Sequence, residues 1–211
     1  NPIVFALLRN AFAALLMSPI ALLLERRAEP MPLSPGNAPR LVACGILLFG
    51  TNFAYTLGLK LTTAVVGAAW QCSIPVLTSA YTIVLGRERF SYRKAAGFVF
   101  ASAGAAVVVA GSGGDDTDGT AHLARNALLG NLCFFVNTNC LALYGICTKP
   151  LMLTHPRSAL TITSCTFVVC ALAMCAPLWL TAASPTLHQL VCPACVVSGT
   201  DWAVPNSAIF G

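Results

Sequence analysis

Charge is scarce in this sequence. Only 9% of its 211 residues are Asp, Glu, Lys or Arg, whereas 57% are hydrophobic. Soluble domains carry about 25% charged residues, so this composition excludes an ordinary water-soluble surface. No charged residue lies between positions 40 and 60, 60 and 87, 94 and 115, 125 and 149, or 157 and 201. Each interval has room for a bilayer-crossing helix, which needs about 20 mainly apolar residues.

Motifs that carry enzyme chemistry are also missing. The sequence has no glycine-rich phosphate loop, no metal-ligand cluster and no nucleophile motif in a suitable context. Most of the ten cysteines lie in apolar stretches, where a free thiol packs like a small apolar side chain. The CxxC spacing of Cys192 and Cys195 lacks a second ligand pair. We therefore expect a protein that is not an enzyme and that has no catalytic residues, no metal and no cofactor.

Seven hydrophobic spans are present instead. They predict an all-α membrane protein, a multi-span helical bundle, in a membrane whose identity stays open. The first span is longer than the core of a signal peptide and contains Arg9, so we expect it to stay in the protein. Because the chain starts at Asn1 and the last span reaches its end, we expect a fragment of a longer chain. The predicted spans are residues 3–24, 41–59, 63–85, 95–111, 127–148, 158–182 and 190–210.

The distribution of positive charge predicts the orientation of the spans. Nine Lys and Arg residues lie in the first, third and fifth connecting loops, and two lie in the alternate loops. Short cytoplasmic loops are enriched in Lys and Arg, so these three loops face the cytoplasm or its equivalent. Topology explains these charges better than nucleic-acid binding does. The first span then runs from the outside to the inside.

An internal repeat is suggested by two short segments. GTNFA at 50–54 and GTDWA at 199–203 share the order small, hydroxyl, Asn or Asp, aromatic, Ala. Matching their spans gives a five-helix repeat, and an odd number of helices inverts the second copy, as the charges independently indicate. We expect seven spans of a ten-helix, inverted-repeat (5+5) parent. Residues 1–114 hold the second to fifth helices of the first unit, 115–125 form an acidic Gly-rich linker loop, and 126–211 begin a truncated second unit.

Three segments carry a family resemblance over nearly all of residues 1–111. They read FALLRNAFAALLMSPIALLLERR, GTNFAYTLGLKLTTAVVGAAWQCSIPVLTSAYTIVLGRERF and KAAGFVFASAGAAVVVAG. With Arg9 early in a helix, the GL-x-x-T step at 58–62, Pro75 and the G-x-E at 86–88, they resemble the drug/metabolite transporter superfamily, in particular the EamA-like transporter family. The resemblance implies a bundle of two inverted five-helix units that exports amino acids, drugs or other metabolites. Substrate does not follow from it.

The leading hypothesis is a membrane secondary transporter that moves a small polar metabolite by alternating access. Two alternatives stay open: a membrane scaffold or receptor-like protein that keeps the bundle without transport, and a nucleotide-sugar or sugar-phosphate exchanger of the same superfamily. An intramembrane enzyme is a weaker competitor. The expected partners are the lipid bilayer and a small-molecule metabolite, with no nucleic acid, and a homodimer stays open.

Polar side chains at membrane depth are the candidates for a substrate path, because in lipid they must find partners inside the bundle. Hydrogen bonding between helices is the alternative role for each, and snorkelling to the outer interface is the alternative for Arg9. Asp201 is an isolated carboxylate and the candidate for proton coupling. The path candidates are Arg9, Asn52, Tyr55, Trp70, Gln71, Asn137 and Tyr144.

Overall fold

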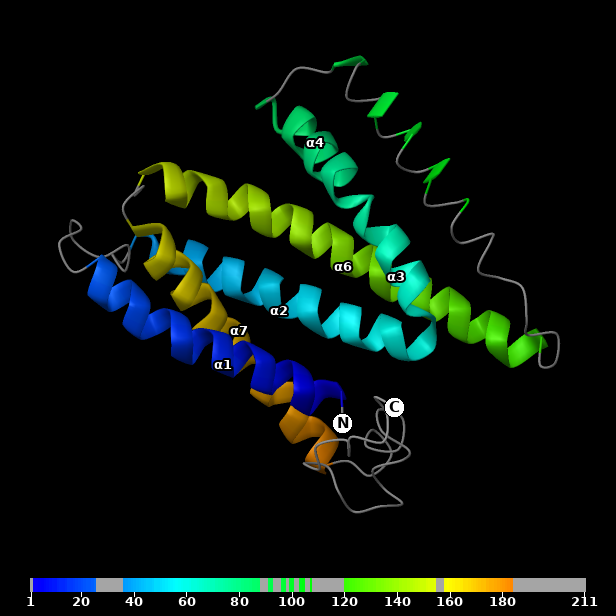
Figure 1. Cartoon of the computed structure of the whole chain (residues 1–211), viewed down its shortest axis with the longest axis horizontal. Helices are drawn as coiled ribbons and strands as arrows, with labels where there is room; N and C mark the ends of the chain where they lie inside the picture. The colour runs from blue at the N-terminus through cyan, green and yellow to red at the C-terminus, as the bar shows by residue number, and fades with distance from the viewer. Residues whose placement is uncertain are drawn as a thin grey trace, which may run out of the picture.

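The computed structural model describes residues 2–25, 36–87, 91–92, 120–154 and 158–183, with scattered positions between 96 and 107. The predicted last span, with Asp201 and the second repeat segment, lies outside these residues, as does most of the predicted span 95–111. Within the described ranges the structure is helical and holds no strand. The helices in Figure 1 are α1 (Pro2–Leu24), α2 (Ala38–Leu61), α3 (Ala64–Gln71), α4 (Ile74–Val84), α6 (Thr120–Thr154) and α7 (Ala159–Ala183).

Four of the described helices, α1, α2, α6 and α7, are long and apolar enough to cross a membrane. The predicted multi-pass, all-helical membrane protein is therefore confirmed. Their bounds agree closely with the prediction, except that α6 extends well beyond the predicted 127–148. Because α6 begins at Thr120, part of the predicted linker 115–125 is helical. The number of seven spans and the ten-helix repeat stay predictions.

The predicted continuous span 63–85 is divided in the structure. α3 ends at Gln71 and α4 begins at Ile74, with Cys72 and Ser73 in a turn between them. Pro75 lies in the first turn of α4. Its ring lacks an N–H, so it cannot bond back to the carbonyl of Gln71, and the first turn of a helix is where that loss is tolerated. Proline alone does not decide the break, because Pro19 and Pro177 lie inside continuous helices. Two short helices, α3 and α4, replace the one continuous helix that was predicted.

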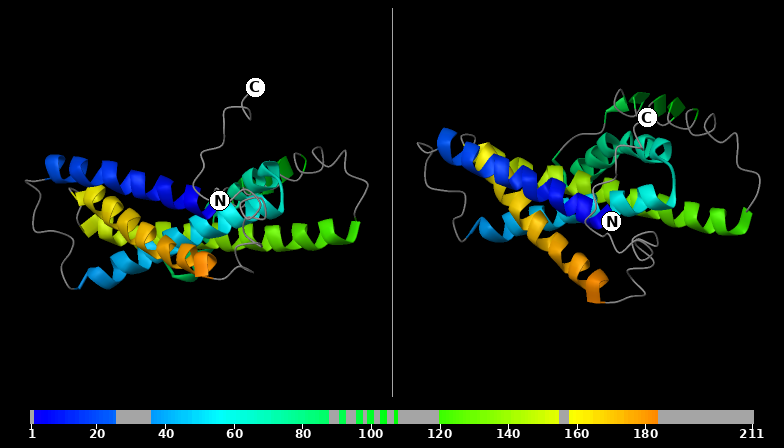
Figure 2. Two further views of the ribbon diagram at one scale, coloured as in Figure 1. Left: turned by 90° about the horizontal axis from the view of Figure 1, so that it is seen from below. Right: turned by 60° about the horizontal axis from the view of Figure 1, so that its bottom comes forward.

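Helix α2 lies at the centre of the bundle. It packs along α6 on one side and along α7 on the other, while α1 lies against α7 and both α3 and α4 lie against α6 (Figures 1 and 2). Glycines permit these close approaches. A Cβ added at Gly45 of α2 would come within 2.4 Å of Val169 on α7, and one at Gly58 would come within 2.9 Å of Phe134 on α6. Small residues at contacts are how helices approach one another in a membrane.

Large apolar side chains face outward, and several polar side chains are buried beside the apolar core. Along α1, Phe5, Phe12 and Leu15 are more than 60% exposed, and Asn10 is only 1% exposed. The amide of Asn137 on α6 is likewise buried, at 1% exposure. An apolar outer surface suits contact with lipid, and polar groups that cannot be left unpaired in lipid collect in the interior.

Candidate functional site

The first polar junction joins α1 to α2. The guanidinium of Arg9 donates a hydrogen bond to Oδ1 of Asn52. The Nδ2 of Asn52 lies 3.4 Å from Oδ1 of Asn10, 3.0 Å from the carbonyl of Leu48 and 3.7 Å from Sγ of Cys170. Asn52 therefore links the charge of Arg9 to a neighbouring amide on α1 and to α7. Two of the seven path candidates, Arg9 and Asn52, therefore lie together at this junction.

The second polar junction joins α2, α3 and α6. Nδ2 of Asn137 donates to the backbone carbonyl of Thr51 across 2.9 Å, and its Oδ1 accepts from Nε2 of Gln71 across 3.3 Å. The buried hydroxyl of Thr51 has no hydrogen-bond partner among the described residues. Gln71 reaches this junction because it ends α3 at the break before Pro75. Buried hydroxyls are nearly always paired, so this one is an exception that calls for an explanation.

Two further polar contacts lie along α6. Nε1 of Trp70 donates to Oδ1 of Asn131 across 2.8 Å, and its ring meets that of Phe135 edge-on. The hydroxyl of Tyr81 on α4 donates to Oδ1 of Asn139. These contacts continue the second junction in both directions along α6.

The remaining path candidates lie elsewhere in the interior. The ring of Tyr55 packs against that of Phe134, with centroids 5.7 Å apart. The hydroxyl of Tyr144 lies 3.4 Å from that of Thr166 on α7. The structure thus brings Arg9 together with Asn52 and brings Gln71 together with Asn137, but it does not gather all seven candidates into one cluster. Their role in a substrate path stays a prediction, and the proton-coupling candidate Asp201 lies outside the described residues.

Sequence reasoning missed two members of these junctions. Asn10 follows Arg9 directly, yet it was not singled out, and its amide is among the most deeply buried polar groups described. Thr51 precedes Asn52 in the repeat segment, where a threonine is easily taken for a helix-surface residue. Each of the two missed residues is next to a predicted candidate in the sequence. This could have identified them, because two consecutive polar residues inside an apolar span cannot both face lipid.

Chemically, the two junctions offer amide and hydroxyl groups with one cation. Amides both donate and accept hydrogen bonds, a hydroxyl does the same, and the guanidinium only donates. Such a set can exchange hydrogen bonds with a polar solute without forming or breaking covalent bonds. The fold and these junctions define a multi-pass helical membrane protein with polar groups inside its bundle.

Comparison with known proteins identifies the family to which this membrane protein belongs. The sequence profile of the EamA-like transporter family matches residues 1–110, and the chain belongs to this family. It is 31% identical over 100 residues to a WAT1-related protein of Arabidopsis thaliana, a match that covers 46% of this chain and 27% of the relative. It is 30% identical over 111 residues to the uncharacterized transporter YyaM of Bacillus subtilis, covering 52% of this chain and 35% of the relative. The chain thus spans well under half the length of either relative. No solved structure matches it significantly.

Proposed function

We propose that the protein is a secondary transporter that moves a small polar metabolite across its membrane by alternating access. Membership of a transporter family supports transport in general. The observation that carries the finer proposal is the unpaired, buried hydroxyl of Thr51 beside the Gln71–Asn137 pair. A solute that hydrogen-bonds there supplies the missing partner, which is how a polar cargo is recognised inside an apolar bundle.

The interhelical bonds suit a motion between two halves. With the units taken as residues 1–114 and 126–211, most polar contacts between helices cross from one unit to the other. In alternating access two repeat units rock against each other around a central site, so these are the bonds that the motion breaks and remakes. Contacts of this kind join Ser18 to Ser164, Thr51 and Gln71 to Asn137, Trp70 to Asn131, Tyr81 to Asn139, and Asn52 to Cys170.

The predicted repeat counterparts α1 and α7 also support the proposal. They run in opposite directions side by side, and the hydroxyls of Ser18 and Ser164 meet across 2.8 Å. Figure 2 shows the pair from two directions. In an inverted repeat the equivalent helices are antiparallel. The pairing is therefore the one that a pseudo-two-fold axis between α1 and α7 would produce.

The test is solute flux in reconstituted vesicles, measured for a panel of amino acids, sugar phosphates, nucleotide sugars and organic acids, with and without an imposed proton gradient. We expect saturable flux of one compound class. Gln71→Ala abolishes at least about 90% of it, a loss of the size that one directional hydrogen bond supplies. Thr56→Ala is the matched control, because among the described residues the Thr56 hydroxyl bonds only a carbonyl of its own helix, that of Asn52, across 2.7 Å.

Three outcomes bear on the proposal. Flux that a proton gradient drives, and that Asp201→Asn uncouples, supports proton coupling through that carboxylate. Gradient-independent flux supports exchange of one solute for another. A folded and inserted protein that moves no compound contradicts transport and favours the scaffold hypothesis.

A further inference from the structure

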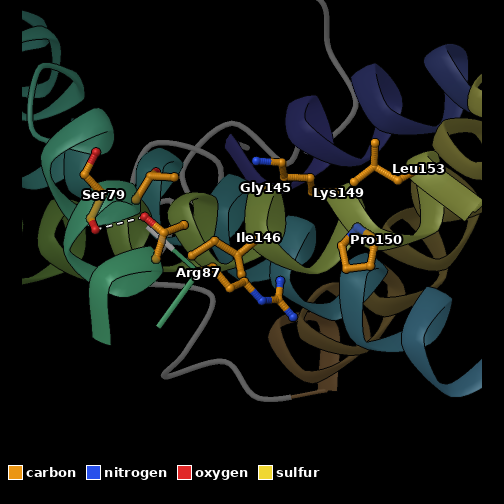
Figure 3. A pocket seen from close by; sticks show the side chains of 9 residues that line it. Ser79, Arg87, Gly145, Ile146, Lys149, Pro150 and Leu153 are labelled. Carbon is orange, nitrogen blue, oxygen red and sulfur yellow. Dashed lines mark hydrogen bonds between the residues drawn. The ribbon is translucent and has the colours of Figure 1, made fainter. Parts of the chain in front are cut away.

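A cavity lies between α4 and α6, away from both polar junctions. It has a volume of about 500 Å³, and none of the path candidates lines it. In Figure 3, Ser79 lies on α4 at one side, and Lys149, Pro150 and Leu153 follow α6 along the other. The described residues that line it are Thr78, Ser79, Thr82, Arg87, Gly145, Ile146, Lys149, Pro150 and Leu153.

Two cations from distant parts of the sequence meet at this cavity. Lys149 comes from the last turns of α6, and Arg87 follows the end of α4. The end of α4 directs Arg87 here, because Gly86 adopts a φ of +67° and the N–H of Arg87 turns back to the carbonyl of Thr82, at 2.9 Å. This is the glycine-dependent turn that closes many helices. The position of Arg87 is thus fixed by backbone hydrogen bonds.

The positive charge of the cavity is not neutralised by the described part of the chain. Glu25 is the only acidic side chain there, and it is engaged at the start of α7. No ion pair of Arg87 or Lys149 with a described residue is present. Two cations that line one cavity raise its positive potential, which favours an anionic ligand.

The other lining groups narrow the chemistry of that ligand. Arg and Lys together suit a phosphoryl group, since the guanidinium fork bonds two oxygens and the ammonium adds a point charge. The hydroxyl of Thr78 donates to the carbonyl of Ile74 at 2.8 Å, and its oxygen can also accept from a ligand hydroxyl. Ile146, Pro150 and Leu153 add an apolar wall for carbon atoms.

We propose that this cavity binds a hydroxyl-bearing phosphate ester through Arg87 and Lys149. The ester can come from a soluble metabolite or from the headgroup of an anionic phospholipid. The predicted orientation places both connecting loops, and hence the cavity, at the cytoplasmic face, where both sources occur. Equilibrium binding does not require transport, so the proposal stands or falls independently of the proposed function.

The test uses two probes that share the glycerol phosphate group. Glycerol 3-phosphate is titrated calorimetrically into the delipidated protein in detergent, with glycerol as the uncharged comparison. Phosphatidylglycerol retained by the protein in nanodiscs is measured by native mass spectrometry, with phosphatidylcholine as the comparison lipid. The variants are Arg87→Gln, Lys149→Gln and Gly145→Leu. Gly145→Leu fills the cavity without changing charge, and a Cβ at Gly145 meets no described atom within 4 Å.

We expect each of these three variants to weaken binding of the effective probe at least about tenfold, as loss of a charged hydrogen bond or of the cavity implies. Arg40→Gln is the matched control, because Arg40 is an exposed cation that does not line the cavity. Binding of glycerol 3-phosphate identifies a soluble ligand, and selective retention of phosphatidylglycerol alone identifies a lipid. Binding of neither probe, or binding that Arg40→Gln weakens as much as Lys149→Gln does, overturns the proposal.

Discussion

The carboxylate of Glu25 at the end of α1 accepts the backbone N–H of Thr161 across 2.9 Å, and it also accepts the Thr161 hydroxyl. Its other oxygen accepts the N–H of Leu160 across 2.8 Å. The first N–H groups of a helix have no partner within it, and they carry a partial positive charge. Glu25 thus caps the start of α7, although it lies 136 positions before Thr161 in the sequence.

Removing this cap is expected to loosen the contact between α1 and α7. Glu25→Ala lowers the free energy of unfolding by about 1–2 kcal/mol, and Glu25→Gln lowers it by less because the amide keeps one acceptor oxygen. Equilibrium unfolding in detergent micelles measures both. Thr154→Ala is the control, since within the described ranges that exposed hydroxyl bonds only the carbonyl of Pro150 in its own helix, at 2.8 Å. Equal stabilities of Glu25→Ala and the control would contradict the role.

Close packing of α2 on α6 depends on Gly58. A Cβ there would lie 2.9 Å from Cε1 of Phe134, and the fully buried Phe134 ring cannot move aside without displacing other groups. We expect Gly58→Ala to cost about 1–3 kcal/mol of unfolding free energy. Gly145→Ala, made where the space is open, is expected to be neutral or slightly stabilising. In the double variant Gly58→Ala/Phe134→Leu the clash is relieved, so its cost falls below the sum of the single costs.

The Gln71–Asn137 hydrogen bond is expected to couple α3 to α6. A double-mutant cycle of Gln71→Ala and Asn137→Ala yields a coupling free energy of about 0.5–1.5 kcal/mol, the range found for polar pairs between membrane helices. Unfolding in mixed micelles supplies the four stabilities. Additive single effects would show that the 3.3 Å contact contributes nothing measurable.

Asn52 is expected to stabilise the protein by accepting a hydrogen bond from the charged side chain of Arg9. Asn52→Leu removes the acceptor and leaves the guanidinium unpaired, which costs about 1–3 kcal/mol, whereas Asn52→Asp keeps an acceptor and costs little. Thermal unfolding of the purified variants ranks them. A stability of Asn52→Leu that matches the unchanged protein would indicate instead that Arg9 reaches the outer interface by snorkelling.

Hydrophobic length was readable from the sequence because charges are absent over whole intervals. Gaps between charged residues predicted α2 and α7 to within a few residues, whereas α1 was predicted although it contains Arg9. The break at Ser73 was not predicted, because a hydropathy pattern does not register the direction of a helix. Pro75 was no sufficient signal either, since Pro19 and Pro177 lie inside continuous helices. The start of α6 at Thr120 was also missed, since the predicted linker contains glycines and acidic residues that favour a loop.

The sequence alone established a helical, multi-pass membrane protein, because burial of apolar length in lipid is a local property of each segment. Of the polar side chains that the described interior buries, it named Asn137 but missed others, among them Asn10 and Thr51. Which of them meet was decided by the tertiary structure: Gln71 meets Asn137, Glu25 meets Thr161, and Arg87 shares a cavity with Lys149. These partners lie on different helices, so their contact depends on how glycines and side-chain shapes let the helices approach, which no one-dimensional pattern encodes.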